Sequence, residues 1–121
     1  MKNKSFEIKE GNDAKDMQYM TWKMFIVWGH FVNFAETKKL PVVITNIIHK
    51  FAVSKSNTHP EGRAIDASTR GWTDQDIEDC ERYMYEKAGK YGAVSFSTGK
   101  PRVLYYHDAG LGSHFHLQVS R

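Results

Sequence analysis

The sequence predicts an α+β protein in which helices pack on one mainly antiparallel sheet. Two segments carry apolar residues at three- and four-residue steps, which is the spacing of a helix face, and the segments between and after them are β-branched or alternate in polarity. The 121 residues are enough for one domain with a hydrophobic core and too few for two ordinary ones. We therefore expect a single domain over 1–121.

The first helix is expected over 14–38. Asp13 or a neighbouring residue can cap it, and Pro41 stops it. His30 lies near the apolar face and is expected to be structural. The apolar face consists of Met17, Met20, Met24, Trp28, Phe31 and Ala35.

Two strands are expected to follow this helix. The segment VVITNII at 42–48 is β-branched almost throughout, as in a central strand that is buried on both faces. After a polar loop, the segment RAIDAS is typical of a short strand. Strand alternation places Ala64 and Asp66 on one side of it and Arg63 and Ile65 on the other.

The second helix is expected to begin at Thr73, where TDQD has a capping-box pattern with Asp in place of the usual Glu. Gly89 and Gly92 end this helix. Cys80 falls on its packing face, where we expect an inert buried thiol rather than a nucleophile. The inner stripe consists of Ile77, Cys80, Met84, Ala88 and Tyr91.

The remaining segment, 93–121, predicts two or three antiparallel strands that turn at glycines. In HFHLQV, strand alternation places His114, His116 and Gln118 on one face. The opposite face holds Phe115, Leu117 and Val119. An isolated His-x-His of this kind is more often the solvent face of a half-buried strand than part of a site.

The composition narrows the functional classes. The net charge of +3 is only mildly basic, and the Lys and Arg residues are scattered, so we expect no nucleic-acid partner. Cys80 is the only cysteine, which excludes an intrachain disulfide and a thiolate zinc site. No apolar segment has the length of a signal peptide or a membrane span. We expect a monomer without a membrane partner, which stays in the cytoplasm until it is released.

Histidine and carboxylate are the metal ligands that this chain can supply. His59, Asp66 and one histidine of HFH offer two imidazoles and a carboxylate, a set suited to Zn²⁺. Three protein ligands leave one coordination position open for water, whose pKa zinc lowers to about 7. A structural zinc is usually closed by four ligands, often cysteines, which this chain does not offer.

Two motifs give this ligand set a family resemblance. Residues 59–66 match HxxGxAxD, and residues 114–116 match the downstream HxH of the zinc DD-peptidases. The chain, from about residue 42 to its end, resembles the M15 family of D-Ala-D-Ala carboxypeptidases and L-alanyl-D-glutamate endopeptidases, many of which are phage endolysins. This family shares a fold with the Hedgehog signalling domain, so the resemblance implies a Hedgehog/DD-peptidase-like fold.

The resemblance also implies an activity. The chain would be a zinc metallopeptidase that hydrolyses peptide bonds in the stem peptides or cross-links of bacterial peptidoglycan, as a phage lysis enzyme or as a virion component. His59, Asp66 and His116 would be the zinc ligands. His114 falls where one branch of the family has a second active-site imidazole, which would hydrogen-bond the zinc water or stabilise the oxyanion.

The general base departs from the family pattern. Members that use an acidic base carry Asp or Glu three residues before the last ligand, where this chain has Ser113. Three explanations are open: His114 takes the task, Asp108 or Glu61 reaches in from a loop, or the protein binds zinc and hydrolyses little.

The walls of the site also depart from the pattern. The Arg that family members often carry after the first strand is absent, and His49 or Lys50 is only a partial substitute for it. Tyr105, Tyr106 and His107 either line the cleft or belong to an aromatic core strand, of which we expect the second. The alternative function is a non-catalytic zinc-binding module that recognises a cell-wall peptide or a protein partner.

Overall fold

The described part of the chain, in a computed structural model, comprises residues 6–9, 17–18, 20–47, 62–94, 98–108 and 112–121. No helix within these ranges is long and apolar enough to cross a membrane. Their buried apolar residues form a hydrophobic core between two helices and a sheet.

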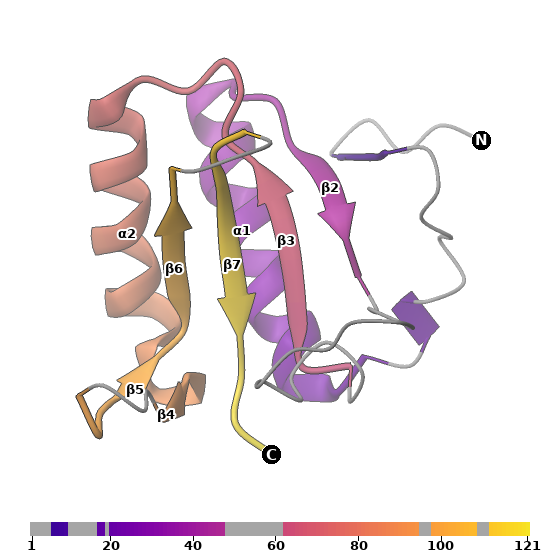
Figure 1. Ribbon diagram of the computed structural model, residues 1–121, viewed down its shortest axis with the longest axis vertical. Coiled ribbons are helices and arrows are strands. Elements are labelled where there is room, and N and C mark those ends of the chain that lie inside the picture. The colour runs from indigo at the N-terminus through magenta and orange to yellow at the C-terminus, as the bar shows by residue number, and fades with distance from the viewer. Residues whose placement is uncertain (1–5, 10–16, 19, 48–61, 95–97, 109–111) are drawn as a thin grey trace.

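The main sheet has the strand order β1-β2-β3-β7-β6 in the described part of the chain (Figure 1). β1 runs parallel to β2, and the other neighbouring pairs are antiparallel. The sheet is therefore mainly antiparallel, as predicted. Its strands are β1 (Glu7–Ile8), β2 (Val43–Asn46), β3 (Ala64–Ser68), β6 (Leu104–His107) and β7 (His114–Gln118). A separate two-stranded ribbon consists of β4 (Ala93–Val94) and β5 (Pro101–Arg102).

Two helices cover one face of the sheet. α1 (Trp22–Lys38) lies behind β3 and β7 in Figure 1, and α2 (Asp74–Ala88) lies beside β6 and continues into the 3-10 turn η2 (Gly89–Tyr91). α1 packs against α2 and β7, and α2 packs against β6. The predicted α+β class, with helices on a mainly antiparallel sheet, is confirmed.

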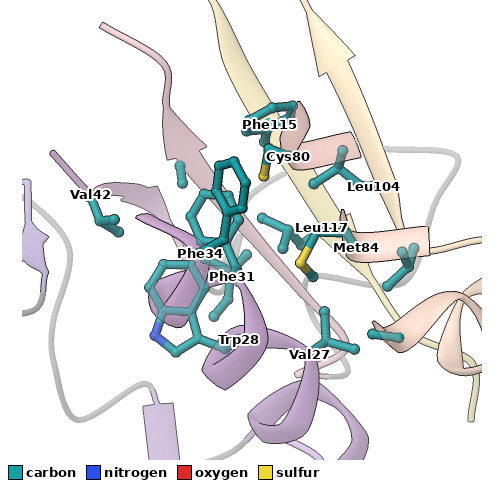
Figure 2. Packing of buried hydrophobic residues seen from close by; sticks show 14 of the residues in the cluster. Val27, Trp28, Phe31, Phe34, Val42, Cys80, Met84, Leu104, Phe115 and Leu117 are labelled. Atoms are coloured by element: carbon teal, nitrogen blue, oxygen red, sulfur yellow. The ribbon is translucent and has the colours of Figure 1, made fainter. Parts of the chain in front are cut away.

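Aromatic rings join α1 to the sheet at the centre of the core. Phe31 is fully buried, and its ring lies 5.3 Å from that of Trp28, 5.8 Å from that of Trp72 and 5.9 Å from that of Phe115. Figure 2 shows the labelled side chains of both helices meeting those of β6 and β7 in this layer. The helices cover this face of the sheet. Strand positions that point to the opposite face can therefore hold polar side chains.

α1 begins later than the sequence predicts. Thr21 is its N-cap: the Thr21 hydroxyl accepts a hydrogen bond from the Met24 backbone N–H at 3.3 Å. The Thr21 N–H donates to the Gly62 carbonyl at 3.1 Å, and Gly62 has φ 71°, which favours glycine. The predicted start at residue 14 is therefore wrong, because a contact with the turn before β3 fixes the helix start. Residues 13–16 lie outside the described part of the chain.

β2 is shorter than predicted and is buried on one face only. Ile44 is fully buried, whereas Val43, Thr45 and Asn46 are half-buried. The register with β3 shifts between Ile44 and Asn46, so the strand is irregular there. The expectation of a strand buried on both faces over 42–48 is wrong for the residues described here, because the helices in the described part of the chain cover a single face of the sheet. Residue 48 lies outside the described part.

The start of α2 confirms the predicted capping box. The Thr73 hydroxyl accepts from the Asp76 N–H at 3.0 Å, and the Asp76 carboxylate accepts from the Thr73 N–H at 2.9 Å. Cys80 is fully buried, and burial, with the Glu81 charge as a smaller cause, raises the pKa of its thiol. A thiol that stays protonated is a poor nucleophile, so the structure supports the structural role expected for Cys80.

Gly92, just before β4, lies very close to the backbone at the end of β5. A Cβ on Gly92 would lie 2.6 Å from the Arg102 carbonyl carbon and 2.7 Å from the Val103 nitrogen. Both atoms belong to the backbone and cannot rotate away. Gly29, in the middle of α1, has open space around the corresponding position.

We expect alanine at these two glycines to change the free energy of unfolding in opposite directions. Gly92→Ala should destabilise the protein by about 1–3 kcal/mol, because the new methyl group overlaps backbone atoms. Gly29→Ala should stabilise it by about 0.5–1 kcal/mol, because alanine is the better helix former. Urea unfolding followed by circular dichroism measures both, and equal effects of the same sign would contradict the close approach at Gly92.

Candidate metal centre

One row of polar side chains crosses the sheet on the face opposite the helices. Asn46 of β2 lies opposite Asp66 of β3, Asp66 lies opposite His116 of β7, and His116 lies opposite Tyr105 of β6. Directly opposed residues of antiparallel strands point to the same face of a sheet. The alternation predicted for β3 and β7 is confirmed, and pairing of the two strands brings the two sequence motifs together.

Asp66 and His116 are in direct contact at the centre of this row. Asp66 Oδ1 lies 2.8 Å from His116 Nδ1, and both side chains are only 15% exposed. Asn46 Nδ2 lies 3.5 Å from the other carboxylate oxygen, Asp66 Oδ2. A carboxylate oxygen and an imidazole nitrogen are therefore held together where little water reaches them, and both are zinc ligand types.

Two further imidazoles lie one step along the strands from this row. His114 of β7 is opposite His107 of β6, and their ring centroids are 5.2 Å apart. The His107 ring is 6.4 Å from that of His116. His114 Nδ1 lies 3.4 Å from the Gly112 carbonyl oxygen. Among the described residues, this face of the sheet thus carries the imidazoles of His107, His114 and His116 beside the Asp66 carboxylate.

The pKa of His107 is lowered by its surroundings. Partial burial is the largest cause, because desolvation disfavours the imidazolium form, and positive charge on His114 or His116 adds to the effect. The negative charge of Asp66 acts in the opposite direction, and Arg102 again lowers the pKa. His107 is therefore neutral at neutral pH.

Among the residues that the structure describes, no group of three or more His, Cys, Asp and Glu side chains is arranged to hold a metal ion. The third predicted ligand, His59, lies outside these residues, as do Glu61, His49 and Lys50. Of the predicted site residues, Asp66, His116 and His114 are described, and all three lie on the same face. The structure brings together two of the three predicted ligands and the predicted catalytic histidine.

Ser113, the residue before β7, points away from the site face and contacts Thr69. Its hydroxyl accepts a hydrogen bond from the buried Thr69 hydroxyl at 2.7 Å, and its carbonyl accepts from the Thr69 N–H at 3.2 Å. Asp108 follows the end of β6 and is exposed. Neither residue therefore places a carboxylate against the Asp66–His116 pair.

Gln118, Tyr105 and His107 also belong to this face, and the sequence did not predict their contacts. The alternation of HFHLQV placed Gln118 correctly, but nothing in the sequence indicated that its side chain contacts His116. The expectation that Tyr105 and His107 belong to a core strand is wrong for both, because only Tyr106 packs into the core, against Phe115. The signal that could have found Tyr105 and His107 is the alternation of LYYH.

We expect His107 to titrate below the ordinary histidine pKa of about 6.5 in metal-free protein. Because its pKa is lower in the folded state, the unfolded chain binds more protons. The contribution of neutral His107 to the free energy of unfolding is present above about pH 6.5. It is lost as the pH falls through the lowered pKa of the folded state. NMR titration of the ring signals measures the pKa. A His107 pKa at or above the ordinary value would contradict this arrangement.

Comparisons of the chain with protein-family models, with curated proteins and with solved structures found no match. The two motifs and the geometry of this face therefore carry the evidence for function.

Proposed function

We propose that the chain is a zinc metallopeptidase of the M15 type, with a Hedgehog/DD-peptidase-like fold, that hydrolyses peptide bonds of bacterial peptidoglycan. One observation carries the proposal: Asp66 and His116, 50 residues apart in sequence, meet at 2.8 Å on adjacent strands. The upstream motif HxxGxAxD ends at Asp66, and the downstream motif HxH ends at His116. The two motifs can form one zinc site only if these two residues lie close together.

The donor set fits zinc. Asp66 supplies a carboxylate oxygen and His116 supplies Nδ1, and we propose His59 as the third ligand. Zinc bound there would supply a Lewis acid that polarises a carbonyl group and acidifies water. The chain also orients the donors, because Asn46 lies beside the Asp66 carboxylate and Gln118 beside the His116 ring.

Proton transfer is assigned to imidazole in this proposal. Ser113 occupies the position of the acidic base in related enzymes and is directed to Thr69. His114 lies on the site face, two residues before His116, where it can donate a hydrogen bond to the oxygen of a scissile amide as charge develops. His107, kept neutral by its lowered pKa, has its ring 5.2 Å from that of His114.

The second candidate function is a zinc-binding module that recognises a cell-wall peptide without cleaving it. The observation that favours it is the side chain of Ser113, which is not acidic and is tied to Thr69 on the helix side. The two functions share the metal ligands and differ in turnover, so separate experiments test them.

The purified protein should carry about one zinc ion per chain after dialysis. Asp66→Ala, His116→Ala and His59→Ala should each weaken zinc binding by more than the 10- to 100-fold that loss of a supporting partner costs. Elemental analysis and chelator competition measure the content and the affinity. His30→Ala, which changes a half-buried histidine on α1, should keep full zinc content. Wild-type protein without zinc, or ligand variants with normal affinity, would refute the metal site.

Purified zinc-loaded protein should release peptides from intact peptidoglycan, and a chelator should abolish the release. His114→Ala should lower the rate by about 10²–10⁴-fold while zinc content is unchanged, because proton transfer contributes that range. Mass spectrometry of the released termini identifies the bond that is cut. Unchanged hydrolysis by His114→Ala would remove its catalytic role, and zinc-loaded wild type without any hydrolysis would favour the binding module.

A further inference from the structure

Gln118 is a buried polar side chain beside the candidate metal centre. It lies on β7 two residues after His116, on the same face, and is 7% exposed. Its amide contacts three groups: His116, Tyr105 and the backbone of Arg102. A buried amide in several hydrogen bonds has its two ends fixed, so its orientation can be deduced from its partners.

The Arg102 backbone decides which way the amide points. Gln118 Nε2 lies 3.2 Å from the Arg102 carbonyl oxygen, which can only accept a hydrogen bond. The group facing Arg102 must therefore be the NH₂, which also donates to the Tyr105 hydroxyl at 3.3 Å. It follows that the Gln118 carbonyl oxygen faces His116.

This orientation determines the proton position on His116. Gln118 Oε1 lies 3.1 Å from His116 Nε2 and can only accept, so Nε2 must carry the hydrogen. Asp66 Oδ1, 2.8 Å from His116 Nδ1, also accepts only, so a hydrogen or a cation must lie between these two atoms. A metal ion bound at Nδ1 would take the place of a hydrogen there, and the hydrogen on Nε2 would remain.

Arg102 and Tyr105 hold the amide in place. The Arg102 guanidinium carbon lies 4.1 Å from the Tyr105 ring centroid, a cation–π contact, and Arg102 Nε donates to the Leu104 carbonyl at 3.3 Å. Tyr105 lies opposite His116 in the β6–β7 register. The close approach of Gly92 to the Arg102 backbone fixes the carbonyl that orients Gln118.

We propose that Gln118 is a positioning residue that holds His116 in the tautomer with hydrogen on Nε2 and leaves Nδ1 to bind a metal ion. The part concerning the ion depends on the proposed zinc site. The hydrogen on Nε2 is held by Gln118 with or without the ion, so it can be measured separately.

The hydrogen on Nε2 is tested by long-range ¹H–¹⁵N NMR on metal-free and on zinc-loaded protein. Wild-type His116 should keep hydrogen on Nε2 in both forms. Gln118→Leu should lose it from Nε2 in the metal-free form and keep a hydrogen only on Nδ1, where the Asp66 carboxylate accepts it. Gln118→Glu should restore the wild-type pattern, because a carboxylate oxygen also accepts from Nε2. Hydrogen on Nδ1 alone in the metal-free wild type would overturn the proposal even if the variants fail to fold.

Zinc affinity provides the second readout, with a matched control. Gln118→Leu should weaken zinc binding by about 10- to 100-fold, as for other partners of metal ligands. Thr69→Val removes another buried hydroxyl hydrogen bond, directed to Ser113 on the helix side, and should leave the affinity and the His116 tautomer unchanged. Equal loss of affinity in both variants would mean that Gln118 acts through general stability, which overturns the proposal. Wild type with hydrogen on Nε2 but no zinc binding would support the positioning role and refute the zinc site.

Discussion

The antiparallel register of β3 with β7 is the constraint on which the rest of the structure depends. It sets Asp66 opposite His116 and, one position along, Ala67 opposite Phe115. A slip of one residue in either strand would turn that strand's polar side chains toward the helices and its apolar ones toward the site. The packing of Phe115 against Phe31 of α1 opposes such a slip, because both rings are fully buried. The hydrophobic core thus holds the site geometry, although it lies on the other face of the sheet.

On the polar face, each side chain restricts the orientation or the charge of its neighbour. Asp66 and His116 are each 15% exposed, and at such low exposure an unpaired charge is costly and a paired one is strongly held. Gln118 extends the network into the sheet and ends on the Arg102 backbone. His107, at the exposed edge, has a lowered pKa and adds no positive charge at neutral pH. In the described part of the chain, imidazole nitrogens therefore gather beside the Asp66 carboxylate, and these are ligand types that zinc binds.

Local sequence periodicity predicted the faces of the strands, because strand alternation depends only on neighbouring residues. It did not predict contacts that depend on distant segments. The start of α1 is set by the Thr21 hydrogen bond to Gly62, and the orientation of Gln118 is set by the Arg102 carbonyl, which the β4–β5 ribbon brings to the sheet. Tyr105 was misplaced for a related reason: an aromatic residue suits either face of a strand, and only the register with β7 decides between them. The choice of Asp66 and His116 came from a motif resemblance, and the strand pairing gives that choice a physical basis.

The most direct test of the account is a crystal structure of the zinc-loaded protein with anomalous diffraction data collected on both sides of the zinc absorption edge. The proposed zinc site predicts one anomalous peak at about 2.0–2.2 Å from an Asp66 carboxylate oxygen and from His116 Nδ1. It also predicts that the Gln118 carbonyl oxygen remains within hydrogen-bond distance of His116 Nε2. An anomalous peak elsewhere in the molecule, or no peak from protein that has been loaded with zinc, would contradict it.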